Sequence, residues 1–258
     1  MGICGKKAVL GFAAGLVGLV ALAHFQELIP NSEFAGEKNR TVDLDIVFTH
    51  PMSNGPVMDM GEPTEFGVLV GGKKIDLMSS LKEKKVEGKT AYAASYKVKR
   101  PGDHVFYIAP APYWEPAEGK MIIHYTKVVV DAFGGEEGWD AMVGLPVEIK
   151  PLTRPYGLWT GNIFRGVVVK NGKPVPFAEI EVEYLNKDAK VAVPDDAFDT
   201  QVIKSDANGT FAYAMPKAGW WAFAALLDGP EMKNPEGKTV DSELGGLIWI
   251  RCRDMVEK

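Results

Sequence analysis

The chain has 258 residues and a formal net charge of −5, with 29 Lys and Arg against 34 Asp and Glu. Its basic residues form no cluster, and an acidic protein without a basic face lacks the charge that would neutralise nucleic-acid phosphates. We therefore expect no nucleic-acid partner, and a cation is the more natural ligand.

An apolar run stands close to the N-terminus. Residues 8–23 are small or apolar, follow Lys6 and Lys7, and end on Ala21-Leu22-Ala23. This pattern is typical of a secretory signal peptide, and the run is shorter than the roughly 20 residues of a spanning helix. We predict that residues 1–23 are a cleaved signal peptide, that the protein is periplasmic and that the mature chain begins at His24. An uncleaved membrane anchor is the alternative.

Cleavage after residue 23 would change the charge and the cysteine content. Loss of Lys6 and Lys7 removes two positive charges, so the formal charge falls from −5 to −7. Loss of Cys4 leaves Cys252 alone, so the mature chain cannot form an intramolecular disulfide. Cys252 ends an apolar run, which favours a buried structural thiol.

The residues before position 150 have the pattern of antiparallel strands. Residues 42–48 alternate between apolar and polar side chains, which predicts a half-buried strand. Residues 66–77 contain Gly71-Gly72 between two apolar runs, which is a hairpin signal. Two further runs rich in β-branched and aromatic residues, 104–108 and 121–130, predict additional strands.

Prolines and a glycine interrupt the strand pattern at residues 150–157, where we place a domain boundary. Beyond it, Asn171-Gly172 is a residue pair suited to a type I′ turn. Short strands with regular turn signals predict an all-β protein. We expect two antiparallel β-sandwich domains, Ig-like or transthyretin-like, over residues 24–150 and 151–258.

Glutamates alternate with apolar residues in one predicted strand of the second half. Glu179, Glu181 and Glu183 lie between apolar neighbours, so we expect their shared face to meet water. We predict a solvated surface position for Glu115 and Glu118 as well, because close acidic pairs are inevitable in an acidic chain.

Sequence motifs of the common enzyme classes are missing. The chain has no HExxH, GxSxG, Walker, GxGxxG or CxxC pattern. We therefore expect a protein that is not an enzyme, and we name no catalytic residue.

All four histidines, His24, His50, His104 and His124, lie before the predicted boundary. A histidine at a new N-terminus offers its α-amine and its imidazole to one metal ion, and an α-amino pKa of about 7.7 to 8.0 makes deprotonation by the metal easy. Further imidazoles suit Ni, Co, Cu or Zn. Each histidine alone fits a core or rim position, but their confinement to one half favours a shared metal site.

Three methionines follow one of these histidines. Met52, Met58 and Met60 lie within ten residues of His50, and soft thioethers would favour Cu(I). The alternative is that Met58 and Met60 pack in the core, which methionine fills readily.

Several motifs together resemble a known family. They are His24-Phe25 with Pro30, His50-Pro51-Met52, the run from Pro101 to Glu115 with Pro-Gly-Asp-His104, Gly138-Trp139-Asp140, residues 151–155, residues 171–176, and residues 206–209 ahead of 218–221. They resemble the DUF4198 or NikK-like periplasmic components of bacterial nickel and cobalt uptake systems, over nearly the whole mature chain. The turn motifs also occur in transthyretin-like and carboxypeptidase-regulatory-like sandwiches, so they indicate the fold alone.

This resemblance implies a function and a set of ligands. The cargo would be Ni(II) or Co(II), held by His24, His50, His104 and His124, and the partner would be an importer of the energy-coupling-factor or ABC type. The protein would be peripheral to the inner membrane or anchored in it. Three alternatives stay open, namely a CopC-like periplasmic copper carrier, a histidine-brace copper oxygenase, and an exported sandwich that binds a partner without a metal.

Overall fold

The structure is a computed structural model that describes residues 24–257, and the predicted signal peptide lies outside them. Within this range the chain forms 21 strands and three short 3₁₀ turns, with no α-helix. None of its helical segments in residues 24–257 has the length and apolar character to cross a membrane. The prediction of an all-β protein with antiparallel sheets is confirmed.

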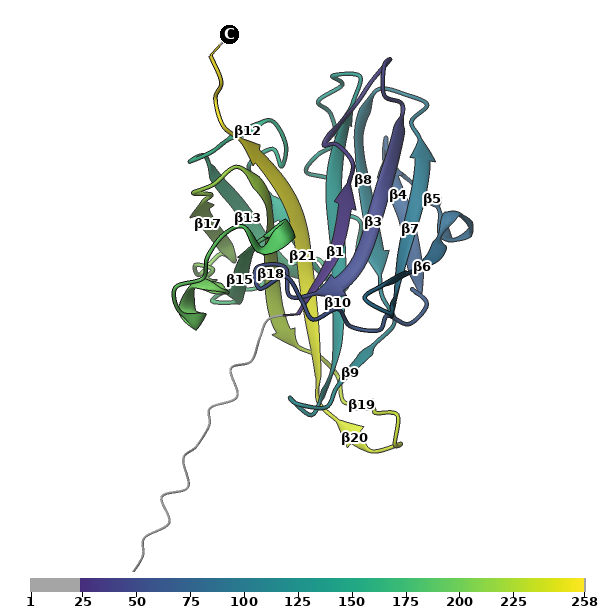
Figure 1. Ribbon diagram of the computed structural model, residues 1–258, viewed down its shortest axis with the longest axis vertical. Coiled ribbons are helices and arrows are strands. Elements are labelled where there is room, and N and C mark those ends of the chain that lie inside the picture. The colour runs from purple at the N-terminus through teal and green to yellow at the C-terminus, as the bar shows by residue number, and fades with distance from the viewer. Residues whose placement is uncertain (1–23, 258) are drawn as a thin grey trace, which may run out of the picture.

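The largest sheet has eleven strands and runs through the middle of the molecule (Figure 1). Its strands are β2 (Phe34–Ala35), β4 (Glu65–Val70), β5 (Lys73–Asp76), β8 (Gly102–Ala109), β9 (Tyr113–Glu115), β10 (Lys120–Ala132), β12 (Leu158–Trp159), β15 (Glu179–Tyr184), β16 (Gln201–Lys204), β18 (Gly219–Asp228) and β21 (Ser242–Arg253). Their main order is β16-β15-β18-β21-β10-β8-β4-β5, with β12 on β21 and with β2 and β9 on β10.

Two four-stranded sheets and one small hairpin complete the fold. The first sheet, in the order β1-β3-β7-β6, contains β1 (Phe25–Pro30), β3 (Thr41–Thr49), β6 (Lys82–Val86) and β7 (Lys89–Lys97). The second contains β11 (Val147–Pro151), β13 (Ile163–Lys170), β14 (Lys173–Pro174) and β17 (Thr210–Ala214). The hairpin is β19 (Met232–Lys233) with β20 (Thr239–Val240), and the 3₁₀ turns are η1 (Met78–Ser80), η2 (Lys187–Ala189) and η3 (Asp196–Phe198).

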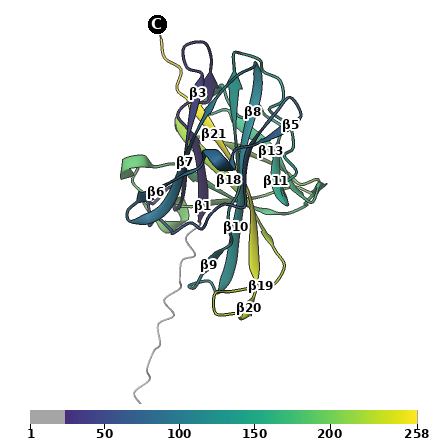
Figure 2. The same ribbon diagram turned by 90° about the vertical axis from the view of Figure 1, so that its right-hand side faces the viewer.

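Each four-stranded sheet encloses a hydrophobic core against the large sheet. The first core includes Phe25, Phe106 and Trp249, and the second includes Phe164 and Phe223, all of them fully buried. Burying one such side chain stabilises the fold by about 1.5 to 3 kcal/mol. Figure 2, turned by 90° from Figure 1, shows β9 and the β19–β20 hairpin projecting together from the lower end.

The local strand and turn predictions agree with the structure. The alternating run at residues 42–48 forms β3, and residues 66–77 form the β4–β5 hairpin. Asn171 and Gly172 have φ angles of 50° and 76°, as a type I′ turn requires. These features depend on neighbouring residues in the chain, which is why the pattern predicts them.

The strands β10 and β21 join the two halves of the chain. They pair in parallel from Met121 opposite Ser242 to Val128 opposite Trp249. A parallel pair needs a long connection, and here the connection is almost the whole second half of the chain. The boundary that we placed after residue 150 falls at the end of β11, which pairs with β13 beyond it. The division into two domains stays a prediction.

The expected exposure of the glutamates on β15 is wrong for Glu183. Glu179 is exposed, but Glu183 has 2% of its surface accessible. Its carboxyl accepts hydrogen bonds from the backbone N–H of Met52, at 3.1 Å, and from the hydroxyl of Thr200, at 2.5 Å. A segment of the first half therefore covers this face, which the pattern of one strand cannot reveal.

A buried ion pair connects β10 to β11. Lys127 Nζ lies 2.6 Å from Glu148 Oε1, and both side chains are 1% exposed. Glu148 also accepts hydrogen bonds from the backbone N–H groups of Val143, Gly144 and Leu145. The pair thus fixes the loop before β11 against the centre of the large sheet.

We predict that Lys127→Met lowers the free energy of unfolding by about 3 to 5 kcal/mol, because the Glu148 carboxylate would stay buried without its cation. Urea denaturation measures this loss. Lys85→Met is the matched control, since Lys85 and Glu83 form an exposed pair and its loss should cost less than about 1 kcal/mol. Equal losses in the two variants would contradict the prediction.

Candidate functional site

The register of β1 against β3 places two histidines opposite each other. Phe25 lies opposite Thr49 and Gln26 opposite Phe48, so the next pair outward is His24 with His50. Residues directly opposite on antiparallel strands have Cβ atoms about 4.5 to 5.5 Å apart. The two imidazole centroids are 4.5 Å apart.

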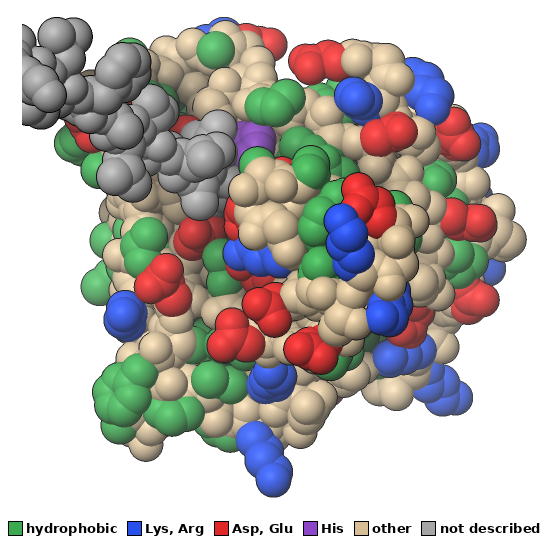
Figure 3. All heavy atoms as spheres, turned by 90° about the horizontal axis from the view of Figure 1, so that it is seen from below, with side chains coloured by type: hydrophobic (Ala, Val, Ile, Leu, Met, Phe, Trp, Pro, Cys, Tyr) green, Lys and Arg blue, Asp and Glu red, His purple; other side chains and the backbone are tan. Residues whose placement is uncertain are grey.

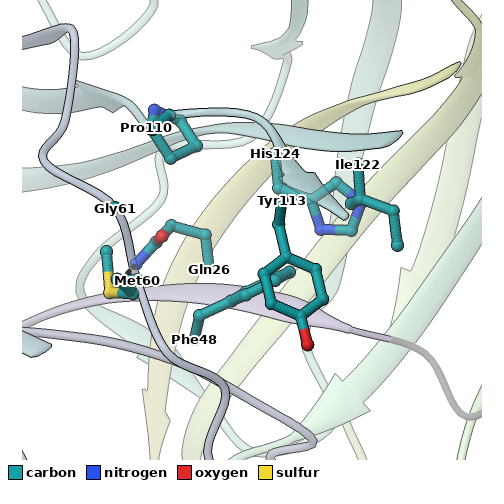
Figure 4. A pocket seen from close by; sticks show the side chains of 9 residues that line it. Gln26, Phe48, Met60, Gly61, Pro110, Tyr113, Ile122 and His124 are labelled. Carbon is teal, nitrogen blue, oxygen red and sulfur yellow. Dashed lines mark hydrogen bonds between the residues drawn. The ribbon is translucent and has the colours of Figure 1, made fainter. Parts of the chain in front are cut away.

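A third histidine reaches the same place from β10. Phe48 packs between the rings, with its centroid 5.6 Å from that of His24 and 5.8 Å from that of His124. Tyr113 packs on Phe48 at 5.2 Å and on His24 at 6.1 Å. Figure 4 shows Phe48, Tyr113 and His124 around a cavity of about 10 Å³. We call His24, His50 and His124 the histidine cluster.

The last strand orients His124. Glu243 of β21 accepts a hydrogen bond from His124 Nε2 at 3.2 Å, and Lys120 Nζ lies 2.6 Å from its other oxygen. Gly245, directly opposite His124, makes room for the ring, because a Cβ there would lie 2.4 Å from His124 Cδ2. Burial alone would raise the pKa of Glu243, but His124 and Lys120 lower it to about 2.

Two carboxylates that we expected at the surface contact His24, and one of them, Glu118, is exposed as expected. Glu115 Oε2 is 2.9 Å from His24 Nε2, and Glu118 Oε1 is 3.8 Å from His24 Nδ1. Glu115 is 8% exposed, so the expected surface position is wrong for it. The reason is the pairing of β9 with β10, where Glu115 lies opposite Lys120 and the connection folds back over the start of β1.

The histidine at the start of β1 is held in its neutral form. Burial lowers the pKa of His24 to about 3, and the nearby His50 and His124 act in the same direction. A neutral imidazole is the form that binds a metal ion. His24 therefore presents a neutral imidazole at neutral pH, in a cluster that also contains an ionised Glu243.

More carboxylates lie behind the cluster, on the side of the second half of the chain. Burial raises the pKa of Glu181 to about 7, that of Glu183 to about 8, and also that of Asp199. Glu181 Oε2 and Asp199 Oδ1 are buried without a hydrogen-bond partner among residues 24–257. His50 acts electrostatically on Asp199, so the acidic group adjoins the cluster. Figure 3 shows this end of the molecule from below, with acidic and basic side chains interspersed on its surface and one histidine visible.

The fourth histidine lies apart from the cluster. His104 of β8 pairs with Val130, six positions further along β10 than His124, which corresponds to about 20 Å at the rise of a strand. Its ring is fully buried against Tyr96 and Phe106, and its Nδ1 contacts the carbonyl oxygen of Gly102 at 2.9 Å. The structure thus brings together three of the four predicted ligands, and His104 is not one of them.

The three methionines are buried. Met58 and Met60 belong to the first hydrophobic core, and Met52 is 8% exposed. Met60 also lines the small cavity beside His124, where its sulfur accepts a weak hydrogen bond from Gln26 Nε2 at 3.9 Å. Figure 4 shows Met60 next to the Gln26 amide.

The donors of the cluster are close but not converged. In the part of the chain that the structure describes, no group of three or more His, Cys, Asp or Glu side chains is arranged to hold a metal ion. The His24 imidazole contacts Glu115, and the His124 imidazole contacts Glu243. Side-chain rotations would be needed before three of these donors could meet one cation.

Comparisons with known proteins give one family match. The model of the family described as domain of unknown function DUF4198 matches residues 21–229. No curated protein is similar enough in sequence to count as a relative.

The comparison with solved structures gives only distant matches. Adhesin InvE of Yersinia pseudotuberculosis is 11% identical, with a TM-score of 0.26 and coverage of 86% of this chain and 58% of that chain. An α2-macroglobulin from Escherichia coli is 10% identical, with a TM-score of 0.28 and coverage of 88% and 16%. The titin Ig tandem A164-A165 is 7% identical, with a TM-score of 0.20 and coverage of 90% and 100%. The chain thus spans 58% and 16% of the first two, and such distant likenesses give no information about function.

The acidic group predicts a dependence of stability on pH. Glu183 titrates near 4.5 in the unfolded chain and at about 8 in the fold, so rising pH between these values favours the unfolded chain. We predict that the free energy of unfolding of the wild type falls by roughly 5 kcal/mol between pH 4.5 and pH 8. Glu183→Gln should not show this fall, because the amide does not titrate. The amide can accept from Met52 and donate to Thr200, so the contacts survive.

Urea denaturation at several pH values, with Glu179→Gln as the control on the exposed end of β15, measures this difference. An unchanged pH slope in Glu183→Gln would contradict the burial that we assign to this carboxyl.

Proposed function

The chain belongs to the DUF4198 family, and from this premise we propose that it is a periplasmic carrier that binds Ni(II) or Co(II) and supplies an importer in the inner membrane. The observation that carries the proposal is the meeting of His24, His50 and His124 at the end of β1. Imidazole nitrogens suit both ions.

The charges around the cluster support a cation as cargo. Glu115 and Glu118 face the two ring nitrogens of His24, and Glu243 faces His124. Lys120 is the one cation among these contacts, and it is already paired with both Glu118 and Glu243. Several carboxylates around the imidazoles attract a divalent ion, and carboxylate oxygens can serve as additional ligands.

The same contacts favour a carrier over a permanent metal centre. The Nε2 atom of His24 already contacts Glu115 and that of His124 contacts Glu243, whereas His124 Nδ1 is buried without a hydrogen-bond partner among residues 24–257. The metal exchanges with these contacts when it binds, and they form again when it leaves. A cargo site needs such reversibility, whereas a structural site is closed and rigid.

Cleavage before His24 strengthens the proposed site. The new α-amine lies on the same residue as the imidazole, and the two together form a chelate with one metal ion. The register of β1 holds this residue opposite His50, so the amine is created next to a second ligand. An additional N-terminal residue would convert the amine into an amide and remove the chelate.

We predict that His50→Gln lowers the affinity for Ni²⁺ at least about 10-fold, since one imidazole contact to the metal is lost. Titration calorimetry on the mature form measures the affinity. His104→Gln is the matched control, because His104 is buried away from the cluster and its variant should bind like the wild type once circular dichroism shows that it is folded.

The role of the amine has a separate measurement. A form with one extra residue before His24 should bind Ni²⁺ more weakly than the form that begins with His24. Equal affinities would rule out the chelate, and equal affinities of the wild type and His50→Gln would rule out the cluster as the metal site.

One observation favours copper as a second candidate cargo. Met60 lines the same small cavity as His124, and a thioether with an imidazole suits Cu(I). If copper is the cargo, Met60→Leu should weaken Cu(I) binding and leave Ni²⁺ binding unchanged. Competition between the two ions in wild type and variant measures this, and unchanged Cu(I) binding in Met60→Leu would exclude the copper carrier.

A further inference from the structure

A second cavity, of about 160 Å³, lies on the other face of β1 and β3 from the cavity beside His124. Its floor is made by Glu27 of β1 and Val47 of β3, which lie opposite each other. Val57, Leu185 and Lys187 form walls, so both halves of the chain contribute to it. His50 of the histidine cluster also lines this cavity, and the proposed metal carrier function uses no other residue of its lining.

Glu27 is a buried residue whose carboxyl lines the cavity and has no hydrogen-bond partner among residues 24–257. Glu27 is 6% exposed, and no hydrogen bond or ion pair reaches its carboxyl from residues 24–257. Lys187 has the largest opposing electrostatic effect on the Glu27 carboxyl, but it forms no ion pair with Glu27. Burial of an unpaired carboxylate is costly, and here burial raises the pKa of Glu27 to about 7. A ligand that carries a cation would relieve this cost.

The walls of the cavity define the rest of that ligand. Val47, Val57, Val86 and Leu185 supply apolar surface. The lining also holds Asp45 and Glu87, against Lys187 as the single lining cation, and Asp45 is already paired with Lys84. The net charge of the cavity lining, with the Asp45–Lys84 pair set aside, is therefore negative. The space has room for several heavy atoms, and a bare metal ion would leave the apolar walls without contacts.

We propose that this cavity binds a small organic ammonium ion. Its NH₃⁺ group donates hydrogen bonds to the Glu27 carboxylate, and its hydrocarbon part packs against Val47 and Leu185. Charge-assisted hydrogen bonds to a buried carboxylate are about twice as strong as neutral ones, so the charged end provides the specificity. The argument from Glu27 does not rest on the proposed metal cargo, although His50 lines the same cavity.

Calorimetry with n-butylammonium chloride on the metal-free protein tests the proposal, with n-butanol as the neutral analogue. We expect saturable binding of n-butylammonium, no binding of n-butanol, and a loss of at least about 10-fold in Glu27→Gln. Glu87→Gln is the matched control: it removes a carboxylate from the exposed part of the same lining and should bind within about threefold of the wild type.

A second measurement needs no variant. In wild-type protein, magnetisation transfer from the butyl chain should reach the methyl groups of Val57 and Leu185. Absence of binding, equal binding in Glu27→Gln, or absence of these contacts would overturn the proposal. So would loss of Ni²⁺ binding in Glu27→Gln together with no n-butylammonium binding, since the cavity would then belong to a metal.

Discussion

The parallel pairing of β10 with β21 is the constraint on which the rest of the structure depends. It places Glu243 within hydrogen-bonding distance of His124 and puts Gly245 opposite that ring. It also brings Trp249 beneath β1, where its indole N–H donates to the carbonyl oxygen of Gln26 at 3.0 Å. Because β1 is buried along its whole length by this arrangement, the position of His24 follows from a strand more than 200 residues away.

Sequence patterns predicted the elements well and their assembly only in part. Alternation in β3 and the turn at Asn171-Gly172 are local properties, and the structure agrees with both. His104 and His124 looked alike in the sequence, since each shares strand parity with apolar neighbours. They differ because β8 pairs with the far end of β10, and the register between two distant strands leaves no trace in either one.

The acidic side of the site was missed for a related reason. Glu115, Glu183 and Glu243 each occur in sequence that is compatible with a solvated surface. Glu115 and Glu183 are buried, and Glu243 is partly buried, where segments from both halves fold over one another. A charged residue that is buried against the pattern of its own strand often has a functional role. A buried charge without compensation lowers stability, so it is retained where it contributes to function. The sequence identifies the histidines as candidate ligands. Their carboxylate neighbours can be identified only from the three-dimensional structure.

The order of strands along the chain also has a consequence for biogenesis. Under the proposed export, translocation delivers His24 to the periplasm first and β21 last. The contact between Glu243 and His124 cannot form until nearly the entire polypeptide has crossed, because β21 occupies the last part of the sequence. A partly translocated chain therefore exposes its histidines without the finished pocket. Maturation of the binding site would coincide with completion of secretion, so that only a fully exported molecule becomes competent to take up its ion.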